Sequence, residues 1–358
     1  MKFQKVCIES LGYTLPSEIW SSSDVEEKLS PLYQRLKLPE GRLELMTGIS
    51  RRGFWPADVR PSQVSVRSCM AALEAAEIDP KLIGCLIHGS VCRDFLEPAT
   101  ACTVHHQTGL PADCLIYDVS NACLGILSGM IQAACMIESG QIRAAMIVGS
   151  EGGRQLVEGT IKALNDDQSL TRKSVKSAVA SLTIGSASAA VVLTHESISK
   201  TKNKLINATT LANTAFHNLC QSDQDQAGAG MQPLMHTDSE LLLKEGIKTG
   251  EDTFARFLEE TNWDRSVIDR TVCHQVGVAH RKLMLESLGL EPEKDFATFG
   301  FLGNTGSAAL PSAFAIGCND GFFKSGDQVA WLGIGSGINS TMMGIQWNES
   351  RVRGGDWD

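Results

Sequence analysis

Cys123 is the residue of this sequence best placed for covalent chemistry, because it lies where a predicted strand passes into a predicted helix. Residues 114–119 form a short apolar run typical of a buried strand. Residues 122–141 are helical in period and almost uniformly small or apolar, as in a helix buried on all sides. A helix N-terminus carries partial positive charge, which lowers the pKa of a thiol and favours a nucleophilic thiolate. The alternative is that Cys123, one of 11 cysteines, is a small buried apolar residue.

Two further polar residues lie at turns beside predicted strands and helices. His274 comes directly after the predicted strand at residues 268–273, where the alternative is a hydrogen-bonded structural histidine. Asn304 lies in a glycine-flanked loop before a small-residue helix at residues 307–318, and its amide either completes a turn or donates to an oxyanion. The remaining histidines are predicted to be structural: His88, His105, His106, His195, His217, His236 and His280.

The elements that must position these residues occur twice along the chain. Strands alternate with helices, which predicts a layered α/β fold with parallel strand pairing. In each half a strand end is followed roughly thirty residues later by a short loop that opens a buried, small-residue helix. By this correspondence Cys123 matches Asn304, and residues 92–97 match residues 274–277. Two such halves, 1–199 and 200–358, joined at the polar residues 200–204, would bring both helices together at the centre.

Composition excludes several other classes of protein. The chain has 358 residues, 43% hydrophobic and 20% charged, which fits a globular protein with a large core. A net charge of −9 argues against nucleic acid as a partner. No apolar run is long enough to span a membrane, and the N-terminus lacks the apolar core of a signal peptide. The cysteines form no CxxC pair, so we expect reduced thiols in a cytoplasmic protein without a metal site or cofactor.

Three motifs in order, residues 121–125 (NACLG), 273–276 (CHQV) and 303–306 (GNTG), resemble the Cys–His–Asn condensing enzymes of the thiolase superfamily, of the ketoacyl-carrier-protein synthase III type. Residues 90–98, 241–248 and 332–339 look closest to the head-to-head acyl-CoA condensing enzymes of bacterial olefin biosynthesis. The resemblance spans nearly the whole chain. It implies a five-layer αβαβα thiolase-like fold from two pseudo-symmetric halves, and a homodimer. Gly277 departs from the Ala-Asn that often follows His-Gln in synthase III enzymes.

The resemblance also implies a role for each site residue. Cys123 would take the first acyl group as a thioester, and His274 and Asn304 would hold the thioester oxygen of the second substrate. Backbone N–H groups of Cys123 and Gly337 would form another oxyanion hole. Glu97 matches the base that reaches the site from the neighbouring subunit. Joining two plain acyl chains requires removal of an α-proton of high pKa, whereas a malonyl substrate loses CO₂ and needs no base, so Glu97 favours the non-decarboxylating reaction.

Four functions remain open from the sequence. The first is condensation of two fatty acyl-CoA molecules to a β-ketoacyl thioester. The second is a decarboxylating 3-oxoacyl synthase III that uses malonyl-carrier protein in fatty-acid biosynthesis. The third is a Cys–His thioesterase, and the fourth is a catalytically silent scaffold. Docking of an acidic carrier protein would need a basic patch on the surface. The candidates are Arg172, Lys173 and Lys176, or Arg281 and Lys282. The alternative is that these residues are ordinary solvated surface charges.

Overall fold

A single sheet of ten strands organises the described part of the chain. The computed structural model describes residues 1–172, 174–222 and 235–357. The strands follow one another across the sheet in this order: β11 (Arg270–Cys273), β12 (Gln328–Gly335), β13 (Asn339–Gln346), β8 (Lys204–Ala212), β1 (Val6–Leu15), β7 (Ala187–His195), β6 (Ala144–Glu151), β4 (Ile83–Gly89) and β5 (Leu115–Val119), with β14 (Val352–Asp356) beside β1. The bridge between Cys7 of β1 and Lys204 of β8 connects its two halves, together with an isolated bridge between Lys2 and Asn207.

The halves repeat one pattern outward from this bridge. β8, β13, β12 and β11 correspond to β1, β7, β6 and β4, and an isolated parallel bridge between Thr271 and Asp295 stands where the first half has β5. The predicted parallel pairing is only partly correct. β4 pairs in parallel with β5 and β6, and β11 with β12, whereas β1–β7, β6–β7, β8–β13 and β12–β13 are antiparallel. The short return at residues 336–338 lets β12 and β13 pair antiparallel without a crossover helix, whereas β6 and β7 are antiparallel although a helix at residues 154–166 lies between them in sequence.

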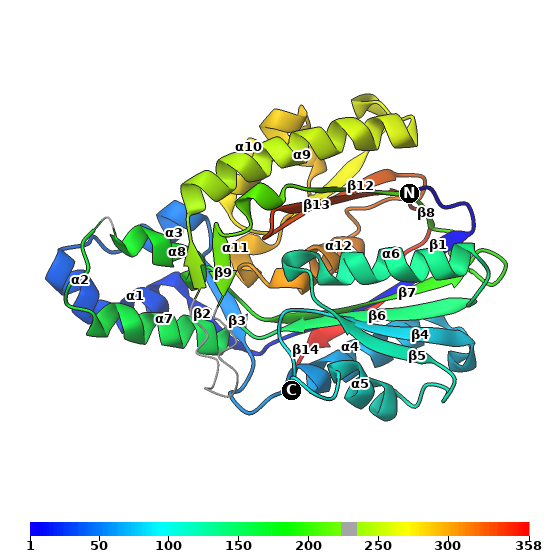
Figure 1. Ribbon diagram of the computed structural model, residues 1–358, viewed down its shortest axis with the longest axis horizontal. Coiled ribbons are helices and arrows are strands. Elements are labelled where there is room, and N and C mark those ends of the chain that lie inside the picture. Colours follow the sequence, from blue (N-terminus) through cyan, green and yellow to red (C-terminus); the bar gives the residue numbers. More distant parts are fainter. Residues whose placement is uncertain (173, 223–234, 358) are drawn as a thin grey trace.

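Figure 1 shows that the sheet bends around two central helices to give five layers. α6 (Gly125–Glu138) and α12 (Ala309–Asn319) lie between the two halves of the sheet. α9 (Ser239–Thr261) and α10 (Val278–Leu288) cover one outer face, and α4 (Pro61–Ala76) and α5 (Thr100–Thr108) cover the other. The thiolase-like αβαβα architecture is therefore confirmed.

The central layer is apolar because both of its helices face a sheet on each side. Leu127 and Met130 of α6 and Phe314 of α12 are buried in one cluster with side chains from both halves of the sheet. The Phe314 ring lies 5.0 Å from that of Trp331 and 4.8 Å from that of Trp347, centroid to centroid. Each such side chain contributes about 1.5–3 kcal/mol to stability on burial, so the central layer is the main anchor of the fold.

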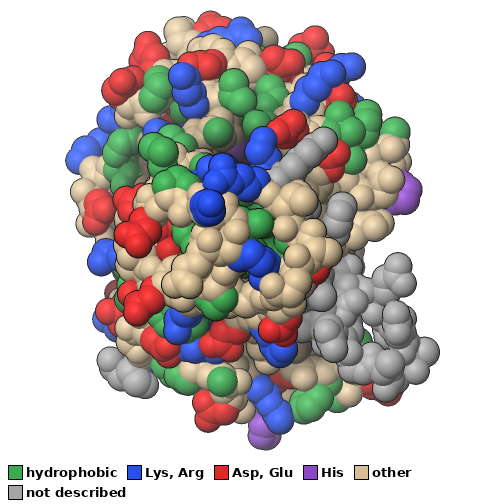
Figure 2. Space-filling view, turned by 90° about the vertical axis from the view of Figure 1, so that its left-hand side faces the viewer, with side chains coloured by type: hydrophobic (Ala, Val, Ile, Leu, Met, Phe, Trp, Pro, Cys, Tyr) green, Lys and Arg blue, Asp and Glu red, His purple; other side chains and the backbone are tan. Residues whose placement is uncertain are grey.

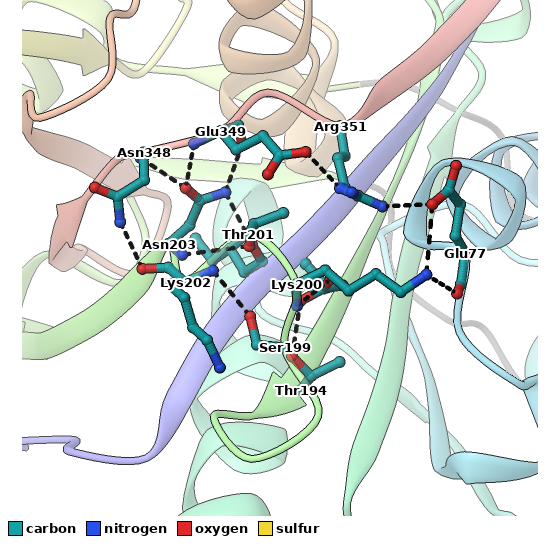
Figure 3. Close-up of polar contacts among 12 residues, drawn as sticks. Glu77, Thr194, Ser199, Lys200, Thr201, Lys202, Asn203, Asn348, Glu349 and Arg351 are labelled. Atoms are coloured by element: carbon teal, nitrogen blue, oxygen red, sulfur yellow. Dashed lines mark hydrogen bonds and ion pairs between the residues drawn. The ribbon is translucent and has the colours of Figure 1, made fainter.

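The joint between the halves is held by one buried amide. Asn203 donates to the carbonyls of Ile8 (3.1 Å) and Glu349 (2.8 Å), and its Oδ1 accepts from the backbone N–H groups of Asn348 (2.7 Å) and Glu349 (3.0 Å). Thr201 adds a hydrogen bond to the Ile8 carbonyl. Figure 3 shows Asn203 of the joint beside Asn348 and Glu349, in the segment that precedes β14. The predicted polar joint is thus ordered, because its polar groups are satisfied within the protein.

Shorter elements extend the molecule at the left of Figure 1. The helices among them are α1 (Ser22–Lys28), α2 (Ser30–Leu36), α3 (Arg42–Thr47), α7 (Arg154–Asp166), α8 (Val179–Leu182) and α11 (Phe299–Leu302). Two strand pairs accompany these helices: β2 (Glu18–Ser21) with β3 (Arg51–Phe54), and β9 (Cys220–Ser222) with β10 (Met235–Thr237). Figure 2 views this end of the molecule, where acidic and basic side chains are interspersed and Lys and Arg side chains gather near the centre. None of the helices in the described residues has the length and hydropathy to cross a membrane.

Candidate active site

Cys123 lies in a short 3₁₀ turn, η2 (Ala122–Leu124), between β5 and α6. α6 starts with its backbone against β4: a Cβ on Gly125 would lie 2.6 Å from the Gly89 carbonyl oxygen. A Cβ on Gly89 would in turn lie 2.5 Å from the backbone of Gly125, so a side chain at either position would force the two elements apart. This backbone contact fixes the start of the helix, and with it Cys123, at the C-terminal end of β4.

The other side of η2 rests on β12. The side chain of Leu124 lies over Gly333 and Gly335, where a Cβ would come within 2.8 Å and 3.1 Å of Leu124 atoms. A Cβ on Gly335 would also lie 3.5 Å from the backbone nitrogen of Cys123. Gly333 and Gly335 therefore make room for the turn that carries Cys123.

Asn121 serves a different purpose from the N-cap that its residue type suggests. Its side chain makes no capping hydrogen bond to η2. Its Nδ2 instead donates to Ser128 Oγ (2.9 Å), and its Oδ1 accepts from Asn339 Nδ2 (3.1 Å). Asn121 thus connects α6 of the first half to β13 of the second, two residues before Cys123.

Asn304 stands at the matching position of the second half. Its backbone pairs with Thr183 and Gly185 at 2.9 Å, and its Oδ1 accepts from Gly306 N at 3.0 Å. No described residue accepts from Nδ2, so this amide remains available as a donor. The 3₁₀ turn that follows, η7 (Gly306–Ala308), leads into α12 and packs against η2. The turns of Cys123 and Asn304 therefore meet.

His274 follows β11, and its backbone N–H donates to the Leu332 carbonyl of β12 at 3.0 Å. Its side chain is buried, edge-to-face with His280 at 6.4 Å between ring centroids. Burial, with a smaller effect of His280, lowers the pKa of His274 to about 3. Burial also lowers the pKa of His280, to about 4, and its Nδ1 has no hydrogen-bond partner among the described residues. Both imidazoles are neutral at physiological pH.

The expectation of a thiolate at Cys123 is wrong for the free protein. Burial, followed by the charge of Glu151 and the thiol of Cys220, raises the pKa of Cys123 to about 12. Loss of solvation outweighs the helix N-terminus, because the partly buried thiol is poorly solvated and no lysine or arginine of the described residues compensates a thiolate there. The resting site thus contains a neutral thiol and a neutral imidazole.

Glu97 makes no hydrogen bond to the other candidates in the described chain. It is exposed, and no hydrogen bond or ion pair joins it to another described residue. Its loop also exposes apolar side chains: 45% of Phe95 and 74% of Leu96 are accessible. Gly337 lies in the turn between β12 and β13 with a φ of +137°, which favours glycine, and a Cβ there would lie 2.5 Å from Asn339 Nδ2.

Glu151, the buried carboxylate at the end of β6 that raises the pKa of Cys123, was not predicted from the sequence. A single carboxylate at the end of a strand carries no periodic signal, and its contacts are remote in sequence. Of the basic candidates for docking, Arg281 is paired with buried Asp295 at 2.6 Å and Arg172 bonds the carbonyls of Leu36 and Lys37, so both have structural roles. Lys173 lies outside the described residues.

Comparisons with known proteins agree with this architecture. Residues 44–154 match the thiolase N-terminal domain, residues 117–214 match 3-oxoacyl-[acyl-carrier-protein] synthase III, and residues 258–347 match the C-terminal part of that synthase. The chain is 41% identical over 351 residues to the acyl-CoA:acyl-CoA alkyltransferase of Shewanella oneidensis, and 34% identical over 347 residues to that of Xanthomonas campestris pv. campestris. Each match covers 97% of this chain and 100% of the relative.

Solved structures of Xanthomonas campestris OleA extend the likeness to three dimensions. A cysteine-to-serine variant with bound lauric acid and lauroyl-CoA has a TM-score of 0.90 at 33% identity, over 96% of this chain and 100% of that chain. Cerulenin-bound OleA has a TM-score of 0.91 at 34% identity, over 97% of this chain and 98% of that chain. With this identity over nearly the full length of its relatives, the chain belongs to the acyl-CoA:acyl-CoA alkyltransferase family and is an acyltransferase of the thiolase superfamily.

Proposed function

We propose that this protein joins two fatty acyl-CoA molecules by a Claisen condensation, with Cys123 as the carrier of the first acyl chain. The observation that supports this best is the meeting of η2, η7 and the ends of β11 and β12, around which Cys123, Asn304 and His274 are arranged. The named activity of the two relatives and the lauroyl-CoA bound to OleA support acyl-CoA as the substrate.

The first half-reaction is acyl transfer to sulfur. Cys123 attacks the thioester carbonyl, the bond from carbonyl carbon to CoA sulfur breaks, and the thiol proton leaves with CoA. Because burial disfavours both the thiolate and an imidazolium, the proton moves as the sulfur attacks and no stable ion pair precedes the reaction. The backbone N–H groups of Cys123 and Gly337 hold the carbonyl oxygen as it gains charge.

The second half-reaction forms the carbon–carbon bond. Glu97 removes the α-proton of the second acyl-CoA, while neutral His274 and the Nδ2 group of Asn304 donate to the enolate oxygen. The α-carbon attacks the acyl-Cys123 carbonyl, the carbon–sulfur bond of Cys123 breaks, and the sulfur takes the proton from Glu97. The product is a 2-alkyl-3-ketoacyl-CoA. Every step uses side chains and backbone groups, so the reaction needs no metal or redox cofactor.

Glu97 would act across a homodimer. Its position on an exposed loop with apolar neighbours, beside the edge strand β5, supports a contact with a second copy of this chain. We further propose that the protein is cytoplasmic, where acyl-CoA and acyl-carrier protein are both accessible as donors.

The test is to incubate the purified protein with lauroyl-CoA alone. We expect CoA release and a β-ketoacyl-CoA, or the ketone left after hydrolysis and decarboxylation, by mass spectrometry. Glu97→Gln should abolish the condensed product while Cys123 still accepts acyl groups. Formation of free lauric acid only would indicate a thioesterase, and a product that requires malonyl-carrier protein and survives Glu97→Gln would indicate a decarboxylating synthase.

A further inference from the structure

Glu151 is a buried carboxylate that the reaction as described above does not use. It ends β6, is 6% exposed, and pairs with no lysine or arginine of the described chain. Burial of an uncompensated carboxylate costs several kcal/mol, so a protein retains one only where donors surround it. Trp55 Nε1 also holds the Glu151 backbone carbonyl at 2.9 Å, which fixes the end of the strand.

The donors around Glu151 come from two catalytic segments. Oε1 accepts from Val91 N at 3.0 Å and Oε2 from Cys92 N at 3.2 Å, at the start of the loop that carries Glu97. Oε1 also accepts from Ser307 Oγ at 2.6 Å and Ser307 N at 3.3 Å, in the turn that follows Asn304. All four contacts are donors, which is the arrangement that suits an acceptor-only carboxylate.

The turn after Asn304 is shaped to let this carboxylate approach. Gly306 has a φ of +56°, and a Cβ there would lie 3.0 Å from Cγ and 3.2 Å from Oε1 of Glu151. The same carboxylate lies near enough to Cys123 to disfavour its ionisation, second only to burial. Glu151 therefore bonds both the loop of Glu97 and the turn of Asn304, and its charge acts on Cys123.

We propose that Glu151 is a positioning residue for the condensation, holding the loop of Glu97 and the turn of Asn304 in one arrangement and placing a negative charge beside Cys123. The proposal rests on the function proposed above. The negative charge of Glu151 affects the second half-reaction, in which Cys123 is the leaving group. A negative charge beside the departing sulfur means that Cys123 must receive its proton as the carbon–sulfur bond breaks, so bond formation and protonation are coupled.

The test compares Glu151→Gln, which removes the charge at constant size, with Glu151→Asp, which keeps it. Glu158→Gln removes a charge from the exposed side of α7 and is the matched control. We expect the pH profile of Cys123 alkylation by iodoacetamide to move to lower pH by about one unit in Glu151→Gln, and not in the other two. A purely structural residue would leave this profile unchanged.

The kinetic expectation separates the two half-reactions. In Glu151→Gln we expect kcat for condensation to fall about tenfold or more, since a small displacement of catalytic groups is costly, with little change in KM or in the initial burst of CoA. Glu151→Asp should recover part of the loss. A wild-type condensation rate together with an unshifted alkylation profile would overturn the proposal.

A second variant and the alkylation measurement allow the Glu151 proposal to be tested even if one experiment fails. If Glu151→Gln does not fold, Ser307→Ala tests the same contact: it should lower condensation several-fold and keep the burst, and wild-type condensation would refute the proposal. If the wild-type protein does not condense lauroyl-CoA, the proposed function fails, whereas the alkylation profiles still report whether the Glu151 charge acts on Cys123.

Discussion

The ionisation of Cys123 provides the most direct test of the site. With a pKa of about 12, about one molecule in ten thousand carries a thiolate at pH 8, whereas an ordinary thiol with a pKa of about 8.5 is about one-quarter ionised. The rare thiolate is also more basic and therefore more nucleophilic, with a Brønsted slope of about 0.4–0.5. On a logarithmic scale, this greater nucleophilicity offsets about half of the rate that is lost through the smaller thiolate fraction. We expect Cys123 to react about fifty- to a hundredfold more slowly than an ordinary thiol.

The assay is alkylation by iodoacetamide, followed for each cysteine by peptide mass spectrometry. Cys135, exposed on α6, is the internal reference for reagent and pH. The rate at Cys123 should rise about tenfold per pH unit and show no plateau up to about pH 10, since the thiol is neutral below its raised pKa and the thiolate fraction grows toward it.

A plateau at neutral pH would refute this reasoning, because it would show a thiolate already present. His274→Ala identifies the cause. If a thiolate–imidazolium pair existed, this variant would remove the plateau, whereas a neutral pair predicts the same slope in both proteins.

Three further predictions concern the assembly and the scaffold. Co-expressed Cys123→Ala and Glu97→Gln chains, each inactive alone, should recover about one-quarter of the wild-type condensation rate, because half of the dimers are hybrids with one intact site; no recovery would place Glu97 in its own subunit's site. Asn203→Ala should lower the free energy of unfolding by about 2–4 kcal/mol in urea titrations, since four hydrogen bonds lose their partner; a loss below about 0.5 kcal/mol would contradict the role of the joint. Gly89→Ala should slow acylation by lauroyl-CoA about a hundredfold by displacing the nucleophile, whereas Gly355→Ala, with open space around it, should have no effect; equal rates would show that the backbone contact is dispensable.

Local patterns were sufficient to predict the two central helices and the junctions that precede them, whereas the five layers were implied by the family resemblance. The all-apolar periods of the segments that became α6 and α12 predicted a central pair of helices, and the repeated order predicted that Cys123 and Asn304 precede them, as the structure shows. Strand direction was predicted less well, because alternation of elements does not specify which neighbours a strand selects. β12 and β13 pair antiparallel through a short return, and β6 and β7 pair antiparallel despite the helix between them.

The pKa of Cys123 and the polar contacts of the site could not be predicted from local sequence patterns. The pKa of Cys123 depends on burial and on Glu151, and Glu151 meets Ser307 across 156 residues of sequence. Asn121 had the residue type of a cap, yet its partners are Ser128 and an asparagine 218 residues away. Residue type and spacing identify candidates for chemistry, whereas the charge state of each depends on neighbours that only the folded chain supplies.

The edge strand β5 connects assembly with catalysis. Leu115 is 51% exposed on this strand, and the outermost backbone groups of β5 have no neighbouring strand in the described chain. Such an edge is prone to pair with another chain. In the proposed homodimer, the second copy that covers β5 would also supply Glu97 to the active site. Dilution below the dissociation constant of the dimer would therefore abolish condensation. It would also expose an edge strand that is prone to aggregation. Specific activity should therefore fall as the enzyme is diluted, even while each separate subunit can still be acylated.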